Sequence, residues 1–345
     1  MSRAREIADL GSPAESGLSN RNLVINGAMQ VWQRGTTIDT ITNGGYLCDR
    51  WRLGLGVTDG NVDVDRSTDV PSEQGFAYSH KISMDASEAS LDAGEQVNLQ
   101  QRFEGQNLQQ ILKGTSSAKS LTLSFWVKSS VASTYSINLR DNDNNRVIAA
   151  TYVVNAANTW ENKTVTFAGD TTGALDNDND RSLDLTFWMD AGTNFTGGTF
   201  ASSWGPSSPS NVRVYDTTGW LESTSPEWYI TGVQLEVGET ATPFEHPRSV
   251  GDELLRCQRY YYKANIGAYM FFSPYMNNTG AATAGTLTIQ YPVPMRATPS
   301  VVQESFGNIS GTPSEYNSTD MIVYAGNALN TSAGHISAFN ADAEL

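Results

Sequence analysis

The chain of 345 residues carries 22 Lys and Arg against 37 Asp and Glu, which gives a formal net charge of −15. This length predicts two or three domains. The charge disfavours nucleic-acid partners and anionic membranes, because both are bound through clustered basic side chains. No apolar run is long enough to span a membrane, and no apolar segment follows Arg3 and Arg5 as a secretory signal would require. We therefore expect no nucleic-acid partner, no membrane insertion and assembly in a cytosol.

Residues 1–20 differ in composition from the rest of the chain. Ile7 and Leu10 share the apolar face of a short helix that Gly11 would end. Two or three helical turns are not stable alone in water. The segment is therefore either a frayed tail or a peg that orders against partner subunits, with Ile7 and Leu10 as the docking side chains. We interpret residues 1–20 as an N-terminal anchor and linker.

Residues 21–246 are predicted to form strands and turns, because Gly, Ser, Thr, Asn and Asp separate short runs of alternating apolar residues. The runs 120–128 and 183–190 each place four apolar side chains on one face and a tryptophan, Trp126 or Trp188, on the other. Such one-sided strands predict an antiparallel β-sandwich, with a short helical insertion at Gln106–Leu112. Further strands are expected at Gly60–Arg66, Ala77–Met84, Gln96–Phe103, Tyr135–Leu139, Arg146–Val154, Trp160–Phe167 and Trp228–Val237.

A helix and a second β region follow the sandwich. The apolar spacing from Asp252 to Tyr262 predicts a connecting helix within residues 247–262. Residues 263–345 are rich in turn formers and poor in apolar residues, so we expect a smaller β domain that gains a core by oligomerising. Its expected strands are Ala268–Ser273, Thr286–Tyr291, Ser300–Glu304 and Asp320–Tyr324.

Two phrases bracket the first β region. One is NLVINGAMQVWQRG at 22–35, and the other is ITGVQLEVG at 230–238, followed by ATPFEH at 241–246 and LRCQRYYY at 255–262. These phrases and their order resemble a jelly-roll module of bacteriophage tail fibres and other virion-surface proteins, which is similar to carbohydrate-binding modules of glycoside hydrolases. The resemblance implies a jelly-roll sandwich in a virion protein made in a bacterial cytoplasm. The phrase YPVPMRATP at 291–299 also resembles the distal ends of phage fibres, which are commonly trimeric.

The resemblance leads to three functional hypotheses. The first is a tail-fibre subunit of a tailed bacteriophage, a homotrimer that attaches to other virion proteins by its N-terminus and contacts host-surface glycans without catalysis. The second is a capsid-decorating, head-fibre or adaptor protein whose sandwich only packs against virion proteins. The third is a polysaccharide-degrading enzyme, which would need paired carboxylates. Asp184 and Asp190 would be about 20 Å apart on an extended strand, so we expect no catalysis.

Two acidic loops are candidates for a cation site. Carboxylate and amide oxygens alternate in both loops, as Ca²⁺ prefers, and the weak candidates are Asp141, Asp143, Asp176, Asp178 and Asp180. Arg146 and Arg181 stand where an EF-hand loop needs Gly, so both loops are predicted as polar hairpin turns. We therefore assign no metal and no cofactor.

The resemblance implies a further cation site in the sandwich. Related modules often hold a structural Ca²⁺ between the first and last strands. Thr231 and Gly232 stand here where an acidic residue is usual, which argues against that site. Asp49 and Glu236 are substitutes that nothing in the sequence favours.

The aromatic residues are the candidates for a glycan site. Sugar rings stack on tryptophan, and neighbouring polar groups bond their hydroxyls. The candidate residues are Trp126, Trp188, Lys128, Asp184 and Asp190 on the polar faces of their strands, together with Trp204 in a loop. The alternative is that loops or a neighbouring subunit cover these rings. Two cysteines make no disulfide framework, so we predict that Cys48 and Cys257 remain thiols.

Overall fold

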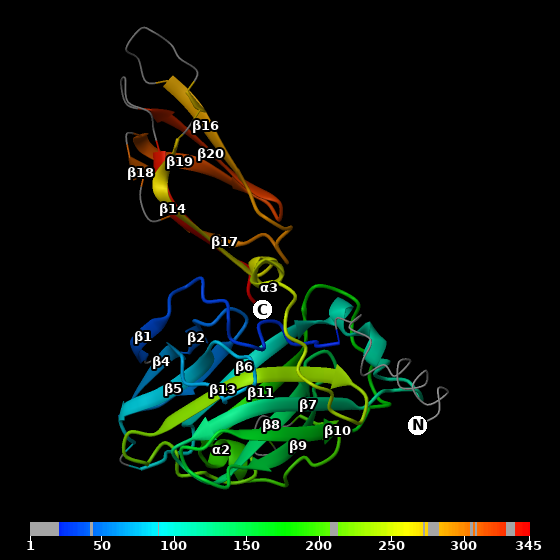
Figure 1. Ribbon diagram of the computed structural model, residues 1–345. Helices are drawn as coiled ribbons and strands as arrows, with labels where there is room; N and C mark the ends of the chain where they lie inside the picture. The colour runs from blue at the N-terminus through cyan, green and yellow to red at the C-terminus, as the bar shows by residue number, and fades with distance from the viewer. Residues whose placement is uncertain are drawn as a thin grey trace, which may run out of the picture. The chain divides into compact units, whose positions relative to one another are not determined.

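The computed structural model describes residues 21–41, 44–88, 90–207, 213–271, 273–274, 283–303, 306–307, 309–328 and 335–345. The chain divides into two compact units, Met1–Arg248 and Ser249–Leu345. Antiparallel strands dominate both units (Figure 1), so the all-β prediction is confirmed. The expected N-terminal peg, with Ile7 and Leu10, lies outside the described residues.

The first unit is a sandwich of two antiparallel sheets. The six-stranded sheet has the order β1(Thr37–Ile41), β4(Asn61–Ser67), β5(Ser79–Ala86), β13(Glu227–Val237), β7(Leu121–Ser129), β10(Glu161–Phe167). The seven-stranded sheet has the order β12(Gly205–Pro206), β9(Arg146–Val153), β8(Thr134–Asp141), β11(Arg181–Ala191), β6(Gln96–Glu104), β3(Arg52–Gly56), β2(Gly45–Tyr46). All seven further strands expected in this region occur, while β1, β2, β3 and β12 were not predicted.

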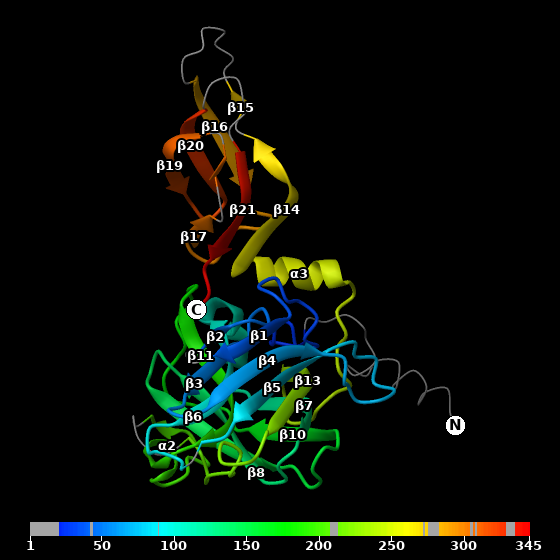
Figure 2. The same cartoon turned by 90° about the vertical axis from the view of Figure 1, so that its left-hand side faces the viewer.

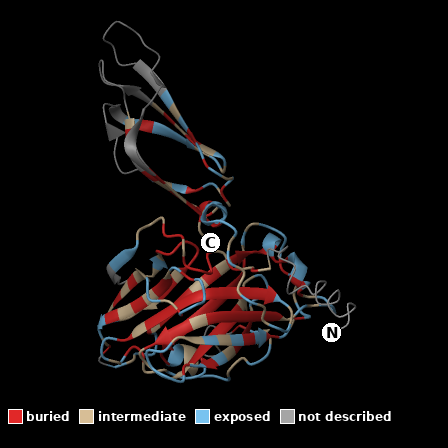
Figure 3. Cartoon of the chain, in the orientation of Figure 1, coloured by how far each residue is buried: buried red, intermediate tan, exposed pale blue. Residues whose placement is uncertain are grey.

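The core lies between the two sheets, as the strand pattern predicts. The apolar faces of β7 and β11 are buried against each other, and the rings of Phe125 and Phe187 meet edge to face at 5.1 Å. Figure 3 shows the strands of this unit mostly buried, with most exposed positions in the connections. Each large side chain buried there stabilises the fold by about 1.5–3 kcal/mol.

The two bracketing phrases contact each other at the edge of the core. The Asn22 side chain donates to the Val233 carbonyl at 3.0 Å and accepts from the Leu235 amide at 3.1 Å. The Val233 amide in turn donates to the Gly27 carbonyl at 2.9 Å. A Cβ on Gly27 would lie 2.1 Å from the Val233 oxygen, so only glycine allows this approach. Both phrases therefore have a structural role in closing the sandwich.

The insertion after β6 differs from the prediction in its helix type. Two short 3₁₀ helices, η1(Gly105–Asn107) and η2(Gln109–Ile111), replace the single expected helix. Leu112 has a positive φ of 53°, which ends the second turn. The only α-helix that the structure describes in this unit is α2(Thr193–Thr196).

The second unit begins with helix α3(Val250–Gln258), whose N-cap Ser249 accepts a bond from the Asp252 amide. The helix was predicted to reach Tyr262, but it ends at Gln258. Tyr261 and Tyr262 instead begin β14 and pair with Asp342 and Ala341. The apolar spacing that predicted the helix does not distinguish a helix from a strand over its last two residues, Tyr261 and Tyr262.

Two four-stranded sheets follow helix α3. One contains β14(Tyr261–Phe271), β21(His335–Asp342), β17(Ser300–Gln303) and β18(Phe306–Gly307), and the other contains β15(Ser273–Pro274), β16(Thr283–Gln290), β20(Met321–Ala328) and β19(Ile309–Asn317). Ile322, Tyr324, Ile336 and Phe339 are fully buried in a core of this unit's own. Three of the four strands expected in this region occur with shifted ends, and the fourth, Ala268–Ser273, overlaps the end of β14 and the start of β15. Among the described residues, no helix has the length and apolar composition needed to cross a membrane.

Candidate functional site

The two candidate tryptophans lie on opposite outer faces of the sandwich. Trp126 belongs to β7 in the six-stranded sheet, and Trp188 belongs to β11 in the seven-stranded sheet. Both side chains point away from the core, because the residues before and after each of them point inward. The sequence predicts both rings in one candidate glycan site. The two rings cannot form one binding platform, because they lie on opposite faces.

Trp188 is buried, so the prediction that it contacts a ligand is wrong. Its side chain is only 2% exposed, and its Nε1 donates to Asn138 Oδ1 at 2.6 Å. The ring contacts Phe195 of α2 at 5.4 Å and packs with Val214. The connection that follows β11 thus covers the ring, which confirms the alternative interpretation for this residue.

The carboxylates beside Trp188 also have internal partners. Asp184 is 2% exposed and pairs with Arg181, whose Nε lies 2.6 Å from its Oδ1. Asp190 is fully buried and accepts bonds from the amides of Ala191, Thr218 and Leu221. Burial raises the pKa of Asp190, although these amides act in the opposite direction. Neither carboxylate is available to a ligand.

Trp126 remains as the accessible candidate. It is half-buried, and its neighbours across the sheet are Thr231 on β13 and Asn162 on β10. Among the described residues, no side chain stacks on this indole or accepts a bond from its Nε1. Figure 2 shows β4, β5, β13, β7 and β10 side by side in this sheet. Trp126 therefore offers a ring face on the outside of the sheet.

A row of charged and aromatic side chains crosses the sheet next to Trp126. By strand register, Asp65 on β4, Lys81 on β5, Tyr229 on β13 and Lys128 on β7 are successive neighbours. Trp160, just before β10, continues this line, because the Lys128 Nζ lies 5.7 Å from its ring. We call these five residues the outer-face row. Only Lys128 among them was a predicted site residue.

Asp69 joins two members of the outer-face row. It forms an ion pair with the Lys128 ammonium and accepts a bond from Trp160 Nε1 at 2.8 Å. Burial alone would raise the pKa of Asp69, but the hydrogen bonds from Lys128 and Trp160 hold it below its usual value. The carboxylate is therefore ionised near neutral pH, and its side chain is 48% exposed. It retains lone pairs that can accept bonds from a ligand.

Charges along the outer-face row compensate one another. Lys81 pairs with Glu227 at 2.8 Å. Burial alone would raise the pKa of Glu227, but the hydrogen bonds from Lys81 and Tyr229 and the charges of Lys81 and Lys128 together lower it. Burial raises the pKa of Tyr229, whose hydroxyl donates to Glu227 at 3.0 Å.

Tyr229 and Lys128 are themselves only 6% and 8% exposed. The accessible part of this face is mainly Trp126, Trp160 and Asp69, whose aromatic surface and carboxylate suit uncharged polyhydroxyl compounds.

Tyr229 could have been found from the sequence, whereas the role of Trp160 could not. Tyr229 lies between Trp228 and Ile230, both fully buried, so the alternation in that strand places it outside. Trp160 stands at the expected start of its strand, where the direction of its side chain is not determined by alternation. The contact between the two rings, 6.1 Å centroid to centroid, depends on tertiary structure.

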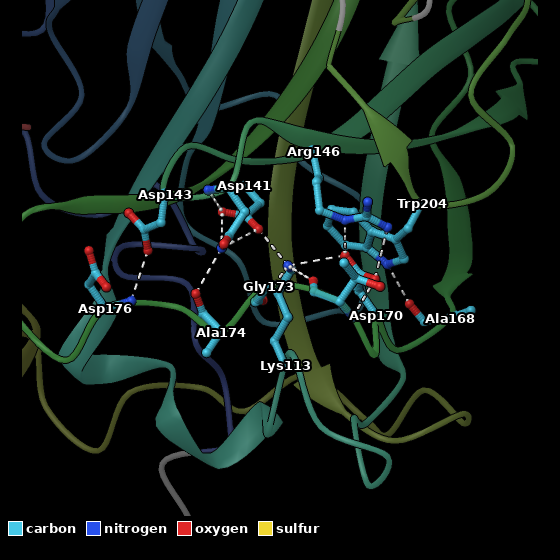
Figure 4. Close-up of polar contacts among 12 residues, drawn as sticks. Lys113, Asp141, Asp143, Arg146, Ala168, Asp170, Gly173, Ala174, Asp176 and Trp204 are labelled. Carbon is cyan, nitrogen blue, oxygen red and sulfur yellow. Dashed lines mark hydrogen bonds and ion pairs between the residues drawn. The ribbon is translucent and has the colours of Figure 1, made fainter.

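Trp204 has a structural role beside a buried lysine. Its Nε1 donates to the Ala168 carbonyl at 2.7 Å, and the Lys113 Nζ lies 5.2 Å from its ring centroid (Figure 4). The ring also packs against the main core. Trp204 therefore does not share a face with Trp126, and the structure gives no support to its role as a glycan contact.

The acidic loops form polar connections that bond to one another. Asp141–Arg146 closes the β8–β9 hairpin, as predicted, but the loop 176–180 joins strands of different sheets and is not a hairpin. Asp143 accepts from the Asp176 amide at 2.9 Å, and Asp178 accepts from the Asp180 amide at 3.0 Å. Among the described residues, no three His, Cys, Asp or Glu side chains are grouped as metal ligands.

The site implied between the first and last strands is also filled by internal contacts. Gly232 has φ +63° at an irregularity of β13, and a Cβ there would lie 2.5 Å from the Phe76 ring. Glu236 accepts from Thr242, and Asp49 accepts from Gln33. The packing of Phe76 thus explains Gly232 in the closing phrase, while the Thr231 hydroxyl donates to the Tyr78 carbonyl at 2.8 Å. Cys48 and Cys257 are both buried thiols that form no disulfide, as predicted.

No protein-family model and no curated protein matches the chain. Solved structures similar to it include the enzymatically active domain of tailspike protein 4 of bacteriophage CBA120, with 16% identity, a TM-score of 0.34, and coverage of 63% of this chain and 21% of the tailspike. TmCBM61 in complex with beta-1,4-galactotriose has 11% identity and a TM-score of 0.32 over 63% of this chain and 99% of that module. A family 11 carbohydrate-binding module from Clostridium thermocellum in complex with a beta-1,3-1,4-mixed-linked tetrasaccharide has 12% identity and a TM-score of 0.30 over 60% and 98% of the two chains.

Proposed function

We propose that the protein binds an uncharged glycan, without catalysis, on the outer face of its six-stranded sheet. The observation that carries this proposal is the half-buried Trp126, whose indole has no described stacking partner beside a row of aromatic and polar side chains. A sugar ring would stack on Trp126. Its hydroxyls would bond to Asp69 and to the exposed Asn162, which lies beside Trp126 on β10.

Charge supports an uncharged ligand over an acidic one. Lys81 and Lys128 are paired with Glu227 and Asp69, so neither ammonium presents an uncompensated charge. The chain as a whole carries −15. An anionic polysaccharide would meet a repulsive field over most of the surface.

A non-catalytic role is supported by the surroundings of the predicted carboxylates. Asp184 and Asp190 are both buried in internal bonds. Asp69 and Glu227 on the proposed face are each paired with a lysine, whereas a glycosidase needs one carboxyl kept protonated as the acid. The protein would hold its ligand by stacking and hydrogen bonds alone.

We further propose that the protein is a tail-fibre subunit of a bacteriophage virion, in which several copies act together on a host-surface glycan. The phrases at 22–35 and 230–246 support this assignment through their resemblance to virion proteins. Multiple copies would raise the weak affinity of one face by effective concentration.

A glycan array with the wild-type chain tests the binding proposal. We expect binding to one family of uncharged glycans, at least tenfold weaker signals for Trp126→Ala, and no change for Tyr215→Ala. Tyr215 is the matched control, because it is an exposed aromatic residue, 58% accessible, outside the six-stranded sheet. Absence of binding by the wild type, or equal signals for the wild type and Trp126→Ala, would refute the proposal. Release of fragments from bound glycans would favour the enzyme instead.

The second candidate function is an adaptor that only packs against virion proteins or other copies. It is favoured by Val302 and Tyr316 in the second unit, which are 63% and 65% exposed. Apolar side chains exposed to this extent are compatible with an interface. We expect a trimeric mass by light scattering for the wild type and a lower mass for Val302→Ser/Tyr316→Ser. A monomeric wild type would contradict the trimer.

A further inference from the structure

The ammonium of Lys113 lies inside a shell of four oxygen atoms. Its Nζ is 2.5 Å from Asp141 Oδ2, 3.1 Å from Asp170 Oδ2, 3.0 Å from the Thr172 carbonyl and 2.8 Å from the Gly173 carbonyl. Figure 4 shows the ammonium between the two carboxylates. We call these four oxygen atoms, toward which the ammonium donates, the Lys113 cage.

The cage is buried and built from three separate segments. The side chains of Lys113, Asp141 and Asp170 are 3%, 0% and 4% exposed. Lys113 follows η2, Asp141 ends β8, and Asp170 follows β10. Lysine is almost never buried to this extent unless its charge is compensated. Because the compensating oxygens come from the other two segments, the cage holds the three segments together.

The backbone at Gly173 is shaped for this contact. Its φ is +72°, and a Cβ at this position would lie 2.4 Å from the Asn144 side chain. Asn144 in turn donates to Asp141 Oδ2 at 3.0 Å and to the Ala174 carbonyl at 2.7 Å. The 172–174 turn therefore directs carbonyl oxygens toward the ammonium.

The donors of the cage are those of a hard cation. Two carboxylates and two peptide carbonyls are the usual ligands of Ca²⁺, which binds such oxygens at about 2.3–2.6 Å. Arg146 bonds Asp170 from outside the shell, with its Nε 2.7 Å from Oδ2. The two carboxylates, Asp141 and Asp170, are thus balanced by the two cations, Lys113 and Arg146. Without the Lys113 charge, the site carries one net negative charge.

We infer that the Lys113 cage is a cation site whose occupant is the protein's own ammonium. A hard divalent cation will occupy the cage once the lysine side chain is shortened. In the wild type, the same donors hold the three segments together with no requirement for a metal at this position.

Thermal unfolding in the presence of Ca²⁺ tests this inference with two variants. Lys113→Ala empties the cage, and Lys113→Met removes the charge but fills the space. We expect both variants to melt several degrees below the wild type, and Ca²⁺ at about 1 mM or above to restore most of the loss in Lys113→Ala only. In Lys113→Ala/Asp170→Asn we expect no restoration.

Terbium luminescence provides a second measurement, because Tb³⁺ binds oxygen ligands as Ca²⁺ does. The Trp204 ring, 5.2 Å from the ammonium, would sensitise an ion in the cage. We expect emission from Lys113→Ala at least fivefold above the wild type, and a loss of that gain in Lys113→Ala/Trp204→Phe. If Lys113→Ala does not fold alone, refolding from denaturant should succeed with Ca²⁺ and fail with EDTA.

Three results would overturn the inference. The first is a melting temperature of Lys113→Ala equal to that of the wild type without Ca²⁺. The second is an equal effect of Ca²⁺ on the melting temperatures of Lys113→Ala and Lys113→Met. The third is equal Tb³⁺ emission from the wild type and Lys113→Ala. Failure of Lys113→Ala to refold under both conditions would also contradict it.

Discussion

The Nζ of Lys128 lies 4.1 Å from the centroid of the Tyr229 ring. Lys81, on the neighbouring strand across β13, places its Nζ 5.8 Å from the same ring. The aromatic ring thus stands between two ammonium groups, each of which it attracts through its electron-rich face. These contacts align the side chains of three adjacent strands and give the outer-face row its order beside Trp126.

The Lys128–Asp69 pair should contribute little to stability. Asp69 is about half exposed, so solvent screens its attraction to Lys128. We expect Lys128→Met, which keeps the aliphatic stem over Tyr229, to lower the free energy of unfolding by about 1 kcal/mol or less. Urea unfolding of Lys128→Met, Asp69→Asn and the double variant will measure the coupling. A coupling of several kcal/mol would show that the pair is a major support of the face.

The two outward tryptophans should differ strongly in their effect on stability. Trp188→Ala removes a buried ring and leaves Asn138 without its donor, so the free energy of unfolding should fall by about 3–5 kcal/mol. Trp126→Ala removes a half-buried ring and should cost roughly 1 kcal/mol. Urea denaturation of both variants will compare these losses. Equal losses would mean that Trp126 is also covered in solution.

Gly232 should tolerate alanine poorly because of Phe76. Gly232→Ala adds both the strain of a positive φ and a methyl group 2.5 Å from the Phe76 ring. Gly219, with φ +73° and no atom within 4 Å of a Cβ, provides a matched control for strain alone. We expect Gly219→Ala to cost about 1 kcal/mol and Gly232→Ala at least twice as much in denaturant unfolding. Similar costs would contradict the packing argument.

Stability should fall as pH decreases from 6.5 to 5, in part through His80. Burial lowers the pKa of His80 to about 3, while its value in the unfolded chain is about 6.5. The unfolded chain therefore binds a proton in this interval that the folded protein does not. The free energy of unfolding should lose up to about 1.4 kcal/mol per pH unit below 6.5 through this group.

His80→Gln isolates this effect. Carboxylates contribute equally to the wild type and to His80→Gln. The difference between the two slopes of unfolding free energy against pH therefore comes from His80. Glu161, whose hydrogen bonds from Lys163 and nearby amides outweigh burial and lower its pKa to about 2, loses its stabilising effect only below pH 4.5. Urea unfolding at pH 7, 6 and 5 should show a flatter profile for His80→Gln. Parallel profiles would mean that His80 is protonated in the folded protein.

The sequence predicted the sandwich well because alternation determines strand faces locally. The apolar faces of β7 and β11 follow from residue order alone, and so does the outward direction of Trp126 and Trp188. The difference between these two residues does not, because both strands have the same pattern. It depends on the connection after β11, which carries Phe195 and Val214 over one sheet and not the other.

The remaining site features arise from segments that are far apart in sequence. Lys113, Asp141 and Asp170 meet only in the folded chain, so the acidic loop could be recognised but its lysine partner could not. The same holds for Asp69, which joins Lys128 and Trp160 across separate strands. Tyr229 is the exception, since the alternation in its own strand already placed it outside.

The central claim is that Trp126 contacts the glycan, and the indole N–H signals of the protein in a nitrogen–proton correlation spectrum test it directly. The chain has 8 tryptophans, and single Trp→Phe variants assign their signals. Addition of the glycan found on the array should shift the Trp126 signal most and the Trp160 signal next. The signals of Trp51 and Trp188, both buried, should remain in place. A bound glycan that leaves the Trp126 signal unmoved would contradict the account.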